Sequence, residues 1–213
     1  MSKAVFPERF LQEWQKACIM NKNKGGMEMA TELEWKFSAT EEAFSALEKD
    51  YEGTLVRIAM ETTYYDTPDR SFASRRCTLR TRLENGKCIC TLKTPAGKGR
   101  NEWEMEAERI DDVAPMLCKL AGLTPPDALI PVCGAKFTRL AATLPVDSAT
   151  VELALDRGVL LGGGKALPLL EVEIEYKDGQ EATAEAFAYS LASAYGLTPE
   201  KKSKFKRANE LTL

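Results

Sequence analysis

Charged and apolar residues alternate along several separate segments of this chain, and this alternation constrains its fold more than any other feature. The clearest case is ELEWK at residues 32–36, in which two acids and a base alternate with Leu33 and Trp35. A pattern of period two predicts a β-strand with one charged face and one apolar face. The same split recurs at residues 78–93, 100–107, 152–156 and 171–175.

A hairpin at Asn85-Gly86 assigns side chains to faces. This dipeptide is the preferred two-residue loop of type I′, and it predicts that Arg82 pairs with Ile89 and Arg80 with Thr91. The charged face of the hairpin then carries Arg80, Arg82 and Lys93, and the opposite face carries Leu79, Leu83, Cys88, Cys90 and Leu92.

The charged faces admit two interpretations. On a single antiparallel strand, a charged face usually contacts solvent. A sheet of about eight strands, however, tends to curl and close, which gives it an inside and an outside. Acids and bases enclosed inside must pair with each other or with a charged ligand. We therefore predict an α+β fold: a closed eight-stranded antiparallel β-barrel with a charged interior and helices packed outside.

One domain preceded by an N-terminal extension is expected along the chain. Residues 1–28 form an N-terminal extension of unknown function, with a helix at 7–20, and they are either an appendage or sequence upstream of a start at Met27 or Met29. Residues 29–213 form the strand-rich domain. Further helices are expected after Thr40, up to Gly122, from 181 to Gly196, and from Thr198 and Pro199 onward.

The chain has no histidine, which excludes catalytic triads, His general bases and His-ligated zinc. Its net charge of −3 does not indicate a nucleic-acid or membrane partner. With six cysteines and no secretion signal, the chain is expected in the cytoplasm with reduced thiols. The segment GGGKA lacks the spacing of a phosphate-binding P-loop and predicts a hairpin turn.

The remaining chemistry suits a polyanion held with divalent cations. Same-face residues of a strand lie ~7 Å apart, so two glutamates can converge on one ion. Carboxylates without His or thiolate ligands favour Mg²⁺ or Mn²⁺. Arginines at i and i+2 offer paired donors to phosphate oxygens. Glu106 and Glu175 continue the alternation and are expected to extend the charged face towards solvent.

An ordered series of motifs resembles the CYTH domains, also called triphosphate tunnel metalloenzymes. ELEWK matches their E-x-E-x-K motif, and the likeness extends from about residue 29 to the C-terminus. The series continues through YYDTPD, LRTR, TLK, GRNEWE, FTR, ELALDRG, LEVEIE and SK.

The resemblance implies a tunnel that binds triphosphate with Mg²⁺ or Mn²⁺. The implied catalytic residues are Glu34 and Lys36. The implied metal ligands are Glu32, Glu34, Glu152, Asp156, Glu171 and Glu173. The implied phosphate-binding residues are Lys36, Arg80, Arg82, Lys93, Arg139 and Lys204, with Arg100 and Glu102 as secondary tunnel residues.

Within the family, the likeness is greatest to bacterial inorganic triphosphatases, which often carry a C-terminal CHAD domain that this sequence lacks. The expected activity is metal-dependent hydrolysis of inorganic triphosphate to pyrophosphate and phosphate by a monomer or homodimer. The alternatives are hydrolysis of thiamine triphosphate or a nucleoside triphosphate, adenylate cyclase activity of class IV type, and a non-catalytic polyphosphate-binding module.

Overall fold

The computed structural model describes residues 29–97 and 99–213, so the helix expected at 7–20 lies outside the described residues. Ten strands form one antiparallel sheet in the order β1-β6-β5-β4-β3-β7-β8-β9-β2-β10. The strands are β1 (Met29–Glu32), β2 (Glu34–Ser38), β3 (Val56–Asp66), β4 (Thr78–Glu84), β5 (Lys87–Pro95), β6 (Arg100–Glu106), β7 (Ile130–Val146), β8 (Ala149–Gly162), β9 (Lys165–Gly179) and β10 (Thr198–Pro199). The helices are α2 (Glu41–Asp50), α3 (Ser71–Ser74), α4 (Ile110–Leu120), α5 (Glu181–Tyr195) and α6 (Lys204–Glu210).

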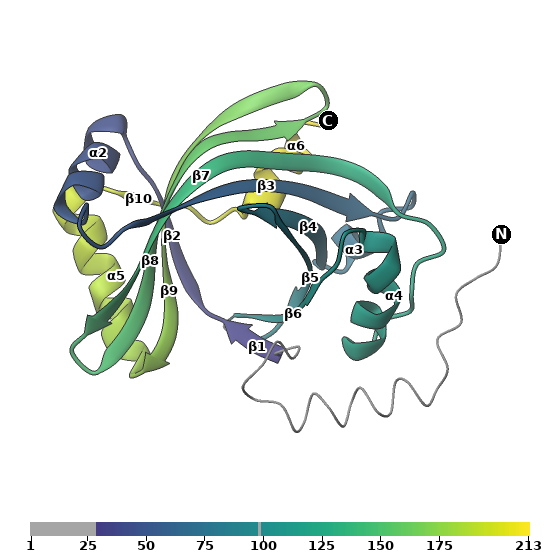
Figure 1. Cartoon of the computed structure of the whole chain (residues 1–213), viewed down its shortest axis with the longest axis horizontal. Coiled ribbons are helices and arrows are strands. Elements are labelled where there is room, and N and C mark those ends of the chain that lie inside the picture. Colours follow the sequence, from purple (N-terminus) through teal and green to yellow (C-terminus); the bar gives the residue numbers. More distant parts are fainter. Residues whose placement is uncertain (1–28, 98) are drawn as a thin grey trace.

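The sheet is strongly curved, and Figure 1 shows α2 and α5 on one outer side and α3 and α4 on the other. The antiparallel, strand-rich prediction is confirmed, but a closed eight-stranded barrel is not, because the hydrogen-bonded order of the described strands ends at β1 and at β10. These ends are nevertheless close in the sequence. β1 pairs with β6, β2 pairs with β9, and only Leu33 separates β1 from β2.

The hairpin between β4 and β5 has the predicted register. Arg82 pairs with Ile89, and Arg80 pairs with Thr91. Both loop residues have positive φ angles, 49° at Asn85 and 90° at Gly86, as a type I′ turn requires. The sequence therefore predicted correctly which side chains of this hairpin share a face.

Two apolar clusters cover the convex side of the sheet. One joins β2, β8 and β9 to α2 and α5, and the fully buried Phe37, Phe44 and Leu153 belong to it. The other joins β4, β5 and β6 to α4, and Leu92, Trp103 and Leu117 belong to it. Because the apolar side chains of these strands point outward towards the helices, their charged side chains must point to the concave side.

Helix ends follow local chemistry, with one correction. Thr40 caps α2 by accepting a hydrogen bond from the backbone of Ala43, as predicted. The helix expected from Thr198 is wrong at its start, since Thr198 pairs with Ser38 and extends the sheet as β10. Helix α6 begins only at Lys204, where the side chain of Ser203 accepts a hydrogen bond from the backbone of Lys206.

Helix α6 lies close to the turn between β8 and β9. At Gly163, which has a φ of +56°, an added Cβ would lie 2.6 Å from the carbonyl oxygen of Leu211. Ala208 of α6 packs in a cluster with Ala135 of β7 and Leu160 of β8. Glycine in this turn therefore allows the C-terminal segment to approach the sheet.

None of the helices in the described part of the chain has the length and apolarity to cross a membrane.

Candidate active site

The concave side of the sheet encloses a cavity of about 280 Å³ lined almost entirely by the alternating polar side chains. Eight glutamates and six basic residues line it among the described residues. The acids are Glu32, Glu34, Glu84, Glu102, Glu104, Glu152, Glu173 and Glu175, and the bases are Arg80, Arg82, Lys93, Arg139, Lys177 and Lys204. The charged faces of the separate strands thus meet around one space.

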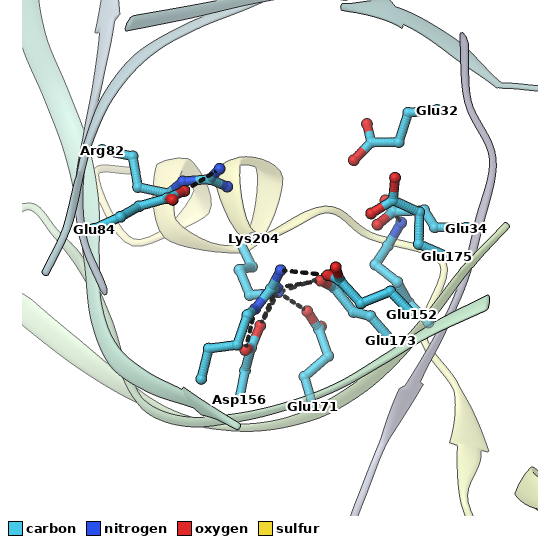
Figure 2. A network of polar contacts seen from close by, with 12 residues as sticks. Glu32, Glu34, Arg82, Glu84, Glu152, Asp156, Glu171, Glu173, Glu175 and Lys204 are labelled. Carbon is cyan, nitrogen blue, oxygen red and sulfur yellow. Dashed lines mark hydrogen bonds and ion pairs between the residues drawn. The ribbon is translucent and has the colours of Figure 1, made fainter. Parts of the chain in front are cut away.

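Acids and bases are unevenly distributed around this cavity. Figure 2 shows Glu32, Glu34, Glu152 and Glu175 together on one side, supplied by β1, β2, β8 and β9. Arg82 and Glu84 of β4 lie on the opposite side, and Lys204 of α6 lies between the two sides. We call the side formed by Glu32, Glu34, Glu152 and Glu175 the acidic wall.

Lysines contact every member of the acidic wall: Lys177 lies 2.8 Å from Glu175 and 3.7 Å from Glu152. The Nζ of Lys36 donates a hydrogen bond of 2.6 Å to Glu34, and the Nζ of Lys93 lies 2.5 Å from a carboxylate oxygen of Glu32. Burial raises the pKa of Glu34, and the neighbouring carboxylate of Glu173 raises it further. Glu34 is therefore a carboxylate whose charge is partly desolvated and which would be stabilised by an added cation.

The two arginines of β4 have unused donors. Arg80 lies 3.6 Å from Glu102, and Arg82 contacts Glu84 and lies 3.9 Å from Glu104. The buried Nε atoms of both arginines have no hydrogen-bond partner. Buried polar groups are normally paired, so these two side chains retain hydrogen-bonding capacity that the described residues do not use.

A second group of acids lies beneath Lys204, and we call Asp156, Glu171 and Glu173 the buried acid cluster. Carboxylate oxygens of the three residues lie within 4.8 Å of one another. The Nζ of Lys204 lies 2.8 Å from Asp156 and 2.8 Å from Glu173, and it also contacts Glu171. The ammonium group therefore already occupies the position at which three carboxylates could hold a metal ion.

Two arginines complete the pairing of this cluster. Arg139 donates two hydrogen bonds to Asp156, from Nε at 2.8 Å and from an Nη at 2.7 Å, and also contacts Glu173. Arg207, one turn after Lys204 in α6, contacts Glu171. The cluster thus joins β7, β8 and β9 to α6 through charged groups.

The ionisation of the cluster follows from these contacts. Burial acts to raise the pKa of Glu173, but Lys204 and Arg139 hold it well below its usual range. Burial acts to lower the pKa of Lys204, but Asp156 and the two glutamates raise it above its usual value. We therefore describe Glu173 as a carboxylate and Lys204 as an ammonium group throughout the neutral range.

The structure brings most of the sequence-predicted site residues together. Ten line the main cavity: Glu32, Glu34, Arg80, Arg82, Lys93, Glu102, Arg139, Glu152, Glu173 and Lys204. Lys36 and Arg100 line a smaller adjoining cavity of about 70 Å³. Asp156 and Glu171 line neither cavity, and both are fully buried.

Sequence reasoning missed some charged residues of the site. Glu175 lines the main cavity with Glu84, Glu104 and Lys177, although the sequence suggested that it extends towards solvent. The alternation on β9 could have placed Glu175 and Lys177 in the site, because both continue the same face of the strand as Glu173. No sequence pattern indicated that Arg207 pairs with the buried acid cluster, since this contact depends on where α6 packs against the sheet.

The acidic wall fits a hard divalent cation. Its carboxylates supply oxygen ligands, and no cysteine is among the described residues that line the cavity. The cavity carries more acids than bases, so a polyanion would enter a site of net negative charge unless it brought cations with it. The residues that could hold the cation are Glu32, Glu34, Glu152 and Glu175.

The protein is thus a curved antiparallel sheet whose concave side encloses a cavity lined by opposed acids and bases. The CYTH domain family model matches residues 30–208. This chain belongs to the CYTH domain family.

Known proteins resemble the chain in sequence and fold. An inorganic triphosphatase of Haemophilus influenzae is 30% identical over 161 residues, which cover 70% of this chain and 45% of that protein. The chain therefore spans about half the length of this curated relative. A structure from Hippeastrum, described as having a dominant triphosphatase activity, has a TM-score of 0.61 and 18% identity over 85% of this chain and 97% of its own. The PH1819 protein of Pyrococcus horikoshii has a TM-score of 0.55 and 24% identity over 84% of this chain and 98% of its own.

Proposed function

We propose that this protein hydrolyses inorganic triphosphate to pyrophosphate and phosphate with the help of Mg²⁺ or Mn²⁺. The single observation that carries the proposal is that Arg80 and Arg82 line the same small cavity as the acidic wall. Basic groups suit the phosphate oxygens, and the acids suit the accompanying cations. The sequence relationship to an inorganic triphosphatase supports the same choice.

The size of the cavity favours a compact substrate. Its volume of about 280 Å³ lies just below the range of roughly 300–1,000 Å³ that is typical of small-molecule sites. Its lining is dominated by charged side chains, and the few apolar ones are Ile58, Met60 and Phe137. A linear triphosphate without an organic group matches this composition best.

The protein's own residues would bind the substrate by position and charge. Arg80 and Arg82 would donate to phosphate oxygens through their guanidinium groups, which line the cavity, and Lys93 would approach from β5. Arg139 and Lys204 would contact the anion from the other side while the buried acid cluster fixes them. Asp156 and Glu171 are thus proposed to hold the side chains of Arg139 and Lys204 in position. Their role as metal ligands remains a prediction from the resemblance. The bound metal would neutralise charge on the phosphates and on the leaving pyrophosphate.

Glu34 is the proposed general base. Its raised pKa suits a group that accepts a proton from the attacking water, and Lys36, 2.6 Å away, orients its carboxylate. The water oxygen bonds to the terminal phosphorus, the bond from that phosphorus to the bridging oxygen breaks, and pyrophosphate leaves with the electron pair. Most of the catalysis comes from positioning and from neutralised charge, since phosphoryl transfer needs little covalent help from the protein.

The test is a panel of substrates with metals. Phosphate release should be measured from inorganic triphosphate, ATP and thiamine triphosphate with Mg²⁺, with Mn²⁺ and with a chelator. We expect metal-dependent release that is fastest with inorganic triphosphate and slower in Arg80→Gln. Faster turnover of an organic triphosphate would move the substrate assignment to that class. Tight binding of triphosphate without any turnover in the presence of metal would contradict the enzymatic proposal.

A further inference from the structure

A groove on the outer surface lies between α4 and the segment that follows it. It has a volume of about 570 Å³ and shares no lining residue with the charged cavity. Ala114, Met116 and Leu129 contribute apolar surface to it, together with Pro115, Pro125 and Pro126. The charged residues along it are all acidic: Asp111, Asp112 and Asp127. An apolar groove with an acidic edge suits an amphipathic partner that carries positive charge.

The N-terminal segment of this chain has these properties. Its predicted helix at 7–20 carries an apolar stripe of Phe10, Leu11, Trp14, Ala17 and Cys18. Residues 1–28 contain five basic and three acidic side chains, whereas residues 7–20 contain two of each, so the net positive charge lies in the residues that flank the predicted helix. The basic residues are Lys3, Arg9, Lys16, Lys22 and Lys24.

The tether between this segment and the sheet is long enough to reach the groove. The backbone of Met29 pairs with Trp103, and the Trp103 side chain packs in the same cluster as Ala114 of α4. Strand β1 therefore pairs with β6, one of the strands against which α4 packs. Residues 21–28 can span at most about 26–29 Å when extended, which exceeds the width of one packed helix.

We propose that residues 7–20 dock as an amphipathic helix in the groove between α4 and residues 125–129 of the same chain. The apolar stripe covers Met116 and Leu129, and the flanking lysines lie near the three aspartates. Docking also holds β1, a strand of four residues whose last residue, Glu32, lines the charged cavity. The occupant is therefore a segment of this chain whose placement supports the site.

Disulfide trapping in the full-length protein tests the proposal, because Cys18 belongs to the apolar stripe. A Met116→Cys variant places a second thiol in the groove, and mild oxidation should produce a monomer in which Cys18 is linked to the introduced thiol, identified by peptide mass. The link should be lost when Cys18→Ser is added, which also separates it from reactions of the other cysteines. Ala186→Cys, at an exposed position of α5 on the other outer side of the sheet, is the matched control.

Two outcomes would overturn the proposal. Linked dimers without linked monomers would assign the groove to a second copy of the chain. Cys18 could also form a disulfide with the introduced thiol equally often in the Met116→Cys and Ala186→Cys variants. That result would show that residues 7–20 do not occupy the groove. Both readouts are independent of triphosphatase activity, so this proposal and the proposed function can fail separately.

Hydrogen exchange gives a second measurement without new thiols. Trp14→Asp puts a charge on the apolar stripe and should speed amide exchange in residues 110–129. Gln12→Asp adds the same charge on the opposite face of the predicted helix and should leave that exchange unchanged. Equal exchange in both variants and the wild type would contradict docking.

Discussion

The acidic wall and the buried acid cluster lie on the same inner face of the sheet but have different surroundings. The side chains of Glu34 and Glu152 are 23% and 27% exposed to the cavity, whereas those of Asp156 and Glu171 are 0% exposed. Each acid of the buried pair contacts two basic groups, while Glu34 contacts one lysine.

Acids of one alternating motif can therefore have two roles, one in structural ion pairs and one in lining the cavity. Glu171, Glu173 and Glu175 follow each other on one face of β9, yet Glu171 is covered by α6 and Glu175 faces the cavity. Acids that are fully buried and contact two protein cations, as Asp156 and Glu171 do, are poorly available to a metal ion. Acids that remain open to the cavity can accept one, and the predictions below separate the two groups.

The largest effect is expected from breaking the buried cluster. Asp156→Ala leaves Arg139 and Lys204 with an unmatched buried charge, and loss of one partner from a buried ion pair costs about 3–5 kcal/mol of the free energy of unfolding. Urea unfolding measures this loss. Glu61→Ala is the control: Glu61 pairs with Lys136 at 3.3 Å on the exposed face, and surface pairs contribute about 0–1 kcal/mol. Similar losses in both variants would show that the buried cluster has no special structural role.

Substitutions in the acidic wall should lower catalytic activity. Glu34→Gln removes the proposed base while keeping the size of the side chain and an acceptor for Lys36. By analogy with the loss of one electrostatic contact in other active sites, turnover should fall about 10²–10³-fold. Steady-state phosphate release at saturating metal measures the fall, and urea unfolding checks that the variant remains folded. Turnover close to that of the wild type would remove Glu34 from the mechanism.

A smaller effect is expected from the basic side of the cavity. Arg82→Gln deletes an unused buried donor, and a hydrogen bond to a charged group contributes about 1.5–3 kcal/mol. We expect a comparable rise in the free-energy barrier for kcat/KM, measured with inorganic triphosphate. Arg157→Gln on the outer face, where Arg157 contacts Glu41 of α2, is the matched control and should leave kcat/KM unchanged.

The smallest effect concerns pH and stability without metal. The pKa of Glu34 is raised by burial and by Glu173, so the folded protein binds this proton more tightly than the unfolded chain does. Glu34 should therefore contribute stability to the metal-free protein that is present at acid pH and is lost as pH rises through the raised pKa. Glu34→Gln removes this titration and should be more stable than the wild type at neutral pH. Thermal unfolding from acid to neutral pH, with chelator present, measures the difference, and a constant difference across that range would contradict the assignment.

Local sequence patterns determined much of this fold. The period-two alternation specified the strands and their faces, and Asn85-Gly86 specified the register between β4 and β5, because side chains on a strand alternate and short turns fix pairing. Thr40 likewise predicted the start of α2. The absence of histidine and the E-x-E pattern limited the chemistry to carboxylates and bases.

Tertiary structure alone decided which charges are available to a ligand. The start of α6 was misplaced because Thr198 is used in the sheet, and the pairing of β10 with β2 depends on residues distant in sequence. The docking of α6 then brings Lys204 and Arg207 to the acids of β8 and β9. Burial and ion pairing depend on how elements pack together, so no local pattern separates the buried acid cluster from the acidic wall.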